Sequence, residues 1–85
     1  MIEEQQAIVR DALELIRAAG GAGALKSKVF AAVRDIGGAP LSPEQQDFVW
    51  TMLERRGWID SHIEPVWHNR RWTITERGAT ALEGM

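Results

Sequence analysis

The sequence predicts one small α+β domain that is mainly helical, and three observations lead to this fold class. Three segments repeat apolar residues with the period of an α-helix, and each is followed by glycine. Two later segments alternate apolar and polar residues as β-strands do, and a short helical segment follows them. Because 85 residues suffice for only one hydrophobic core, residues 1–85 are expected to form a single domain.

The composition is that of a globular domain without a strong charge. The chain has 10 Lys and Arg against 12 Asp and Glu, a net charge of −2, so DNA binding would need a local basic patch. Cysteine is absent, which excludes disulfides and thiolate metal sites. The acidic start MIEEQQ is unlike a signal peptide, and no apolar run approaches the ~20 residues of a membrane span. We therefore expect a cytoplasmic protein that does not contact membranes.

Residues 2–19 predict an amphipathic helix that Gly20 and Gly21 end. At about 100° per residue its apolar side chains share an arc roughly 160° wide. They are Ile2, Ile8, Val9, Ala12, Leu13, Leu15, Ile16 and Ala19. A helix that packs on only one small core needs a narrower stripe, so this width predicts a symmetric homodimer built partly on the first helix.

Residues 24–36 predict a second helix that ends at Gly37 and Gly38. Its apolar stripe contains Leu25, Val29, Ala32, Val33 and Ile36. The segment GGAGALKS, residues 20–27, nearly fits the phosphate-binding pattern G-x-x-x-x-G-K-[ST], but Leu25 stands where the second glycine belongs. The segment also follows a helix instead of a strand, so we interpret it as a glycine-rich loop between helices.

A third helix is predicted from Pro43 to Arg56, because Ser42 can cap its first amides and Gln45 can complete a capping box. Gly57 ends it. Its expected apolar face contains Phe48, Val49, Met52 and Leu53. Trp50 projects away from this face, so it is expected either to be exposed and available to a partner or to lie against a neighbouring segment of the chain.

A β-hairpin is predicted after the third helix, followed by a terminal helix over residues 76–82 with Thr75 as its cap. Residues that share a strand face are Ile59, Ser61 and Ile63 on the first strand, and Trp72 and Ile74 on the second. Trp58 and Trp72 are expected to pack on the core, whereas Trp67 falls at the hairpin tip and is expected to be exposed.

The chain offers little that would support catalysis or metal binding. Carboxylates and imidazoles gather on the hairpin at Asp60, His62, Glu64 and His68, but this spacing is more typical of a solvated surface than of a metal site. The sequence contains neither G-x-S-x-G nor H-E-x-x-H. We therefore expect no enzyme activity, no metal and no cofactor.

Two local strings and the order of the elements resemble the winged helix-turn-helix superfamily. LERRGWI, residues 53–59, resembles the passage from the third helix of that family into its hairpin, and RRWTITERG, residues 70–78, resembles the return strand and its exit. The resemblance covers nearly the whole chain. It implies three helices, a two-stranded wing and a short C-terminal helix, in a protein that binds double-stranded DNA and regulates transcription.

The resemblance also implies how DNA would be contacted: the third helix enters the major groove, while the start of the second helix and the wing contact phosphates. Base-edge contacts then fall to Gln45, Gln46 and Thr51, since glutamine can pair with adenine. Positive charges available for the DNA backbone are Lys26, Lys28, Arg55, Arg70 and Arg71.

An acidic surface on the third helix favours a different function. At about 100° per residue, Glu44, Asp47, Thr51 and Glu54 share an arc roughly 80° wide opposite the expected apolar face. Three carboxylates there would oppose the phosphate attraction that supplies most of the affinity for DNA. The alternative is a protein-interaction domain whose contact residues are Glu44, Asp47, Trp50, Glu54 and Trp67. Both functions remain open at this point.

Overall fold

The computed structural model describes residues 3–85 and confirms a mainly helical α+β fold. Ile2, which the sequence places on the apolar side of the first helix, lies outside the described residues. The elements in chain order are α1 (Glu3–Ala18), the 3₁₀ turn η1 (Gly20–Ala22), α2 (Lys26–Ala32), α3 (Pro43–Arg55), β1 (Ile59–Ile63), β2 (Arg70–Ile74) and α4 (Glu76–Glu83).

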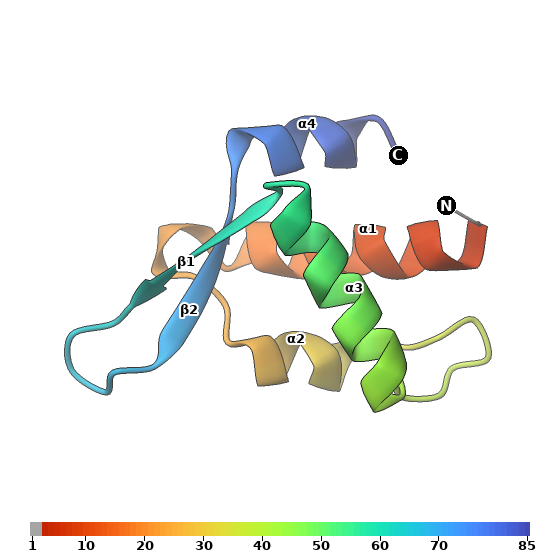
Figure 1. The fold of residues 1–85 in the computed structure, drawn as a ribbon, viewed down its shortest axis with the longest axis horizontal. Coiled ribbons are helices and arrows are strands. Elements are labelled where there is room, and N and C mark those ends of the chain that lie inside the picture. Colours follow the sequence, from red (N-terminus) through yellow and green to blue (C-terminus); the bar gives the residue numbers. More distant parts are fainter. Residues whose placement is uncertain (1–2) are drawn as a thin grey trace.

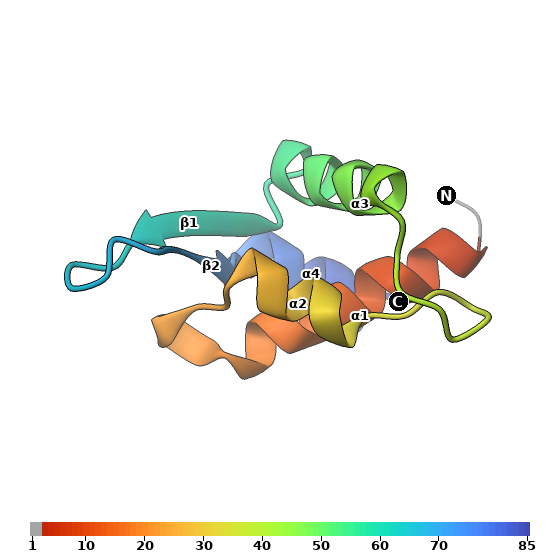
Figure 2. The same cartoon turned by 90° about the horizontal axis from the view of Figure 1, so that it is seen from below.

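Helix α1 is the central element, with α4 along one side, α2 along the other and α3 crossing over it (Figure 1). The hairpin β1–β2 extends away from the helices, as the second view also shows (Figure 2). α1 contacts α2, α3, α4 and β2. This packing buries Ile8, Val9, Ala12, Leu13 and Ile16 within one chain. Packing within one chain therefore explains the wide apolar arc of α1, and the arc no longer argues for a dimer. A dimer on this helix stays an untested prediction.

Helix α2 is shorter than the sequence predicts at both ends. Ala24 is not helical but pairs with Trp72, and the helix ends at Ala32 because Val33 adopts an extended conformation with ψ of 135°. Beyond it, the Asp35 carboxylate accepts hydrogen bonds from the amides of Gly37 and Ala39, both at 2.9 Å. Such a local side-chain turn competes with helix formation. The predicted extension to Ile36 is thus wrong, and Ile36 is 82% exposed instead of packed.

Helix α3 begins as the sequence predicts, with a complete capping box. The Ser42 hydroxyl accepts from the Gln45 amide at 3.2 Å, and the Gln45 side-chain oxygen accepts from the Ser42 amide at 2.8 Å. Pro43 occupies the first turn, where its missing N–H costs nothing. The predicted end at Arg56 is one residue beyond the observed last helical residue, Arg55.

The buried face of α3 differs from the expected one. Val49, Trp50 and Leu53 are its buried residues, while Phe48 is 50% exposed. At 100° per residue this turns the helix by about 80° relative to the prediction. The cause is Trp50, whose ring centroid lies 5.2 Å from that of Phe30 and 5.2 Å from that of Trp72. Of the two alternatives for Trp50, an exposed partner contact is therefore wrong and packing against other segments of the chain is confirmed, because only 2% of the residue is exposed.

The hairpin has the predicted strands in antiparallel register, with Ile59 opposite Ile74 and Ser61 opposite Trp72. Trp58, Trp72 and Ile74 pack against the core, as expected. Trp67 at the tip is 76% exposed, also as expected. Ile63 differs: it is 48% exposed, because the hairpin continues beyond the helices that cover its base.

A backbone bridge ties the hairpin to the segment before α2. The Ala24 amide donates to the Trp72 carbonyl and the Trp72 amide donates to the Ala24 carbonyl, each at 2.8 Å. Ala24 thus forms an isolated antiparallel β-bridge with β2. Within the same contact Gly23 is buried, with a φ of 84° that favours glycine. This bridge fixes the start of α2 relative to the hairpin.

Helix α4 starts at the predicted cap and lies tightly against the corner between α3 and β1. The Thr75 hydroxyl accepts from the Gly78 amide at 3.0 Å and donates to the Gly57 carbonyl at 2.6 Å. The Thr75 amide donates to the Trp58 carbonyl at 3.0 Å. Gly78 is buried against that same carbonyl, where a Cβ atom would overlap the oxygen.

Candidate functional site

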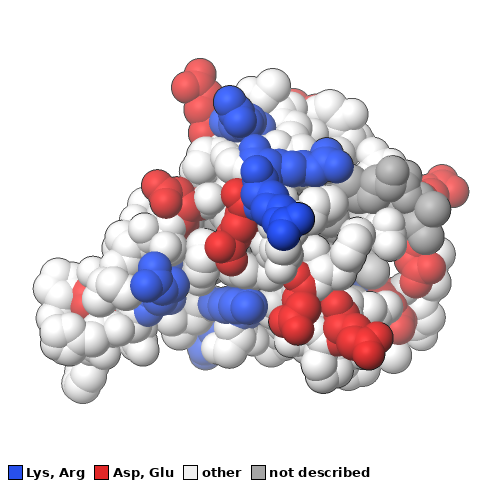
Figure 3. All heavy atoms as spheres, viewed as in Figure 1, with Lys and Arg blue, Asp and Glu red and all other residues white. Residues whose placement is uncertain are grey.

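Two hollows flank the exposed side of α3, and each is lined in part by a basic residue from another element. The hollow toward α2 is lined by Lys26, Ser27, Phe30, Ala31 and Gln46. The hollow toward the hairpin is lined by Glu54, Ile59, Asp60, Ser61, Arg70 and Trp72. Figure 3 shows basic side chains on this face over the hairpin, near the start of α2 and over the end of α3, with acidic side chains along α3 between them.

Four of the predicted DNA-contacting cations are exposed. Lys28 and Arg55 are exposed on α2 and α3, respectively. The ammonium of Lys26 lies 5.5 Å from the centroid of the Trp50 ring, so the buried tryptophan positions this cation beside α3. Arg70 donates to the Ser61 hydroxyl at 2.7 Å, which holds its guanidinium along the hairpin. The structure therefore places cations from three different elements around α3.

Arg71, the fifth predicted cation, is in a different environment from Arg70. Its Nε donates to the Glu64 carboxylate at 2.6 Å, and its Nη1 donates to the Gly23 carbonyl at 3.3 Å. The hydrogen bond from Arg71 lowers the pKa of Glu64, and a second hydrogen bond, from Asn69, acts in the same direction. Since its charge is balanced by Glu64, Arg71 is a weaker candidate for a phosphate contact than Arg70.

The two glutamines expected to read base edges are engaged in local hydrogen bonds. Gln45 forms the capping box of α3. Gln46 Nε2 donates to the Leu41 carbonyl at 3.0 Å and is partly buried. A base contact by either side chain would require breaking its present hydrogen bond. Thr51 remains exposed and is the predicted base-edge residue with the fewest local constraints.

The acidic residues of α3 are all exposed, and they keep the common arc that the sequence predicts, because they lie on one continuous helix. Glu54 lines the hollow toward the hairpin together with Arg70, so its charge lies beside a basic residue. Asp47 borders another hollow with Phe48, and Glu44 lies in the first turn. The three carboxylates therefore stay on one side of α3, with Glu54 beside a cation from the hairpin.

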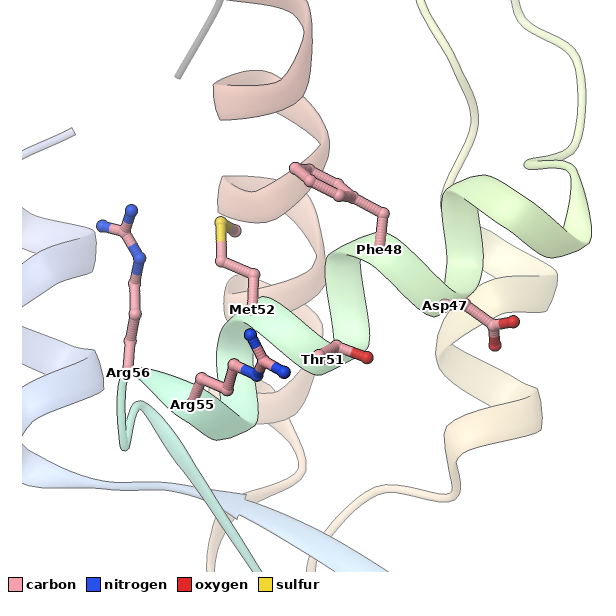
Figure 4. Close-up of a pocket in the computed structure, with 6 residues that line it drawn as sticks. All are labelled: Asp47, Phe48, Thr51, Met52, Arg55 and Arg56. Carbon is pink, nitrogen blue, oxygen red and sulfur yellow. The ribbon is translucent and has the colours of Figure 1, made fainter.

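A hollow of about 520 Å³ on α3 went unpredicted (Figure 4). It is lined by Asp47, Phe48, Thr51, Met52, Arg55 and Arg56. In Figure 4 Phe48 and Met52 point to the same side of the helix, with Arg55 and Arg56 following at its C-terminal end. The periodicity of the sequence instead predicts both apolar side chains to be in the core. The sequence also contains an alternative stripe of Val49, Trp50 and Leu53. This stripe buries the ring of Trp50 in place of the smaller ring of Phe48, and it is the signal that indicates the observed arrangement.

Arg77 is a further residue near this surface that the sequence does not predict as a site residue. It lies against Gly57, because a Cβ atom built there would be 3.7 Å from Arg77 Nη1. Arg56 lies next to this point, with its guanidinium 5.1 Å from the centroid of the Trp58 ring. Arg55, Arg56 and Arg77 therefore gather where α3 ends and α4 begins. Only the fold brings residue 77 back to the end of α3, so no sequence spacing indicated this cluster.

Within residues 3–85, no group of three or more histidine, aspartate or glutamate side chains is arranged to hold a metal ion. On the hairpin, Asp60 accepts from the Ser61 amide, and Glu64 is engaged by Arg71 and Asn69. The same part of the chain has no helix that is both long and apolar enough to cross a membrane. The GGAGALKS segment forms the turn η1 and the extended residues that lead into α2.

Comparison with known proteins adds no assignment to this geometry. No family model matches the chain, and no curated protein or solved structure is significantly similar to it.

Proposed function

We propose that this chain is a winged helix-turn-helix domain that binds double-stranded DNA in the cytoplasm and regulates transcription. In this proposal the hairpin β1–β2 is the wing and α3 approaches the major groove. The observation that supports it is the placement of exposed cations from three elements around α3: Lys26 on α2, Arg55 on α3 and Arg70 on the hairpin.

The net charge of the chain sets the expected strength of this binding. At −2 the whole protein does not attract DNA, so affinity depends on a few local contacts. Each phosphate contact contributes about 0.9 to the slope of log affinity against log salt concentration. With Lys26, Lys28, Arg55 and Arg70 as contacts, we expect a slope between about −3 and −4, and weak binding at physiological salt.

The test is fluorescence anisotropy of a labelled duplex titrated with protein at several salt concentrations. Lys26→Ala together with Arg70→Ala should reduce the salt slope by about 1.8, because two phosphate contacts are lost. Arg10→Ala together with Arg17→Ala is the matched control, since both arginines lie on α1 and line none of the hollows beside α3. The control should keep the slope of the unmodified protein.

A result of no binding at low salt, for either random or native upstream DNA, would end the DNA-binding proposal. Equal loss of slope in the α1 control would also contradict it, because the attraction would then depend on total charge. Arg71→Ala provides an internal comparison. Since Arg71 is paired with Glu64, its removal should change the slope less than removal of Arg70.

The second candidate function is a protein-interaction domain, favoured by the exposed carboxylates of α3 and by the exposed Trp67. Changing Glu44 and Glu54 to Gln and Asp47 to Asn separates the two functions. If α3 approaches phosphates, removal of three negative charges should tighten non-specific DNA binding. An unchanged DNA affinity would favour the protein-interaction function.

A further inference from the structure

The outer surface of α3 carries a regular stripe that the core does not use. Glu44, Phe48, Thr51 and Arg55 follow one another at spacings of four, three and four residues, and all four are exposed. This is the spacing at which one helix packs along another. Phe48 is 50% exposed in the middle of the stripe, beside Met52 and the hollow of about 520 Å³. We call these four residues the outer stripe.

The outer stripe is complementary to itself when two copies run antiparallel. Its first turn is acidic, its middle is apolar and its last turn is basic. With Phe48 of one copy opposite Met52 of the other, the two Thr51 side chains meet near the twofold axis. Glu44 of each copy then faces Arg55 and Arg56 of the other. A single twofold rotation therefore pairs each acidic end with a basic end and brings the apolar centres of the two stripes together.

We propose that the chain forms a weak twofold dimer in which the outer stripe of α3 packs antiparallel against the same stripe of a second copy. The two ends of the stripe argue for this occupant. A partner helix must present a basic end to Glu44 and an acidic end to Arg55, with apolar groups between them. α3 itself has this order of charges when its direction is reversed.

The size of the contact indicates that the dimer is weak. α3 has 13 residues and is about 20 Å long, so a contact between two such helices is smaller than the standard interface of about 1,600 Å². The charged ends are solvent-exposed and screened by salt, so they contribute more to register than to affinity. We expect a dissociation constant on the order of 0.1 to 1 mM at low salt.

The dimer covers residues that the proposed function needs for contact with DNA. Thr51 and Arg55 lie inside the contact, so a copy engaged through the outer stripe cannot present them to DNA. Self-association would then lower the concentration of DNA-competent protein. The dimer itself is independent of the proposed function, because it is measured with protein alone.

The experiment exchanges charges between two full-length variants and measures their association by sedimentation equilibrium. The acidic variant carries Arg55→Glu and Arg56→Glu, so its stripe is negative at both ends. The basic variant carries Glu44→Arg and Asp47→Arg, so its stripe is positive at both ends. Each variant alone should associate at least tenfold more weakly than the unmodified protein, because like charges face each other across the axis.

An equimolar mixture of the two variants should associate at least tenfold more tightly than either variant alone, because opposite charges then meet at both ends. The control exchanges charges on α1, with Glu14→Arg and Arg17→Glu, and should leave self-association unchanged. Circular dichroism establishes that each variant is folded. Phe48→Ser provides a second test that does not depend on charge, since it removes the apolar centre and should abolish the dimer.

Three outcomes would overturn the proposal. One is an unmodified protein that stays monomeric up to about 1 mM, since even a dissociation constant at the upper limit of the expected range would give a large fraction of dimer there. The second is a dimer that persists in Phe48→Ser, which would place the contact on another surface. The third is a mixture of charge variants that associates no better than the separate variants, since the antiparallel register requires that rescue.

Discussion

Substitution of Gly78 by alanine is a sharp test of how α4 is attached. Gly78 lies in the first turn of α4 and is buried against the backbone of Trp58. An added Cβ atom would overlap the Trp58 carbonyl oxygen and lie 2.9 Å from both the carbonyl carbon of Trp58 and Cγ1 of Ile74. Neither the backbone nor the branched side chain can move away without shifting α4 relative to β1.

The size of the effect follows from two opposing contributions. Alanine is favoured over glycine inside a helix by about 1 kcal/mol at most. The overlap is with backbone atoms and requires a shift of roughly 1 Å, so its cost lies at the upper end of the usual range for overpacking, about 3 kcal/mol. The shift also strains the hydrogen bond from the Thr75 amide to the Trp58 carbonyl. We expect a net loss of about 2 kcal/mol, which lowers the Tm of a domain this small by about 8–16 °C.

Thermal unfolding followed by circular dichroism measures this loss, with Gly84→Ala, at the C-cap of the same helix, as the control. A Cβ atom at Gly84 would make ordinary contacts of 3.5 and 3.8 Å with the carbonyl oxygens of Ala81 and Thr80. Gly84→Ala should therefore change the free energy of unfolding by less than about 0.5 kcal/mol. A Tm that is unchanged or raised in Gly78→Ala would refute the close packing of α4 on the α3–β1 corner.

Two further predictions concern the core and the hairpin. Leu13→Ala should lower the free energy of unfolding by about 2–5 kcal/mol in urea titration, because Leu13 is fully buried where α1 meets the rest of the core; a loss below about 1 kcal/mol would contradict that placement. Arg71→Ala should raise the pKa of Glu64 toward its ordinary value of 4.5 in an NMR titration, whereas Arg70→Ala should not. Because the folded-state pKa of Glu64 is lowered, the ion pair contributes stability above about pH 4.5 and loses it as the pH falls through the folded-state pKa.

Much of the fold could be predicted because its signals are local. The capping box of Ser42 and Gln45 lies within four residues, and Thr75 caps α4 in the same local way. The hairpin follows from the alternation of residues 59–63 and 70–74. These features depend on nearest neighbours along the chain, so the sequence alone specifies them.

The departures arise where tertiary contacts override local pattern. Periodicity alone favours Phe48 and Met52 as the core side of α3, but the contacts of Trp50 with Phe30 and Trp72 turn the helix the other way. The end of α2 depends on the hydrogen bonds that Asp35 makes with later residues. The candidate site changes for the same reason, since the pairing of Arg71 with Glu64 is visible only once the hairpin register is known.

The bridge between Ala24 and Trp72 couples the movement of the hairpin to that of the segment at the start of α2. Its two hydrogen bonds of 2.8 Å resist separation of the strand from the loop, so a displacement of the tip at Trp67 is transmitted to the segment that carries Lys26. α3, by contrast, meets the hairpin through side chains and through its own chain connection. A force on the hairpin tip, such as contact with a binding partner, should therefore move Lys26 together with the hairpin. The amide protons of Ala24 and Trp72 should exchange with solvent together, as one mechanical unit.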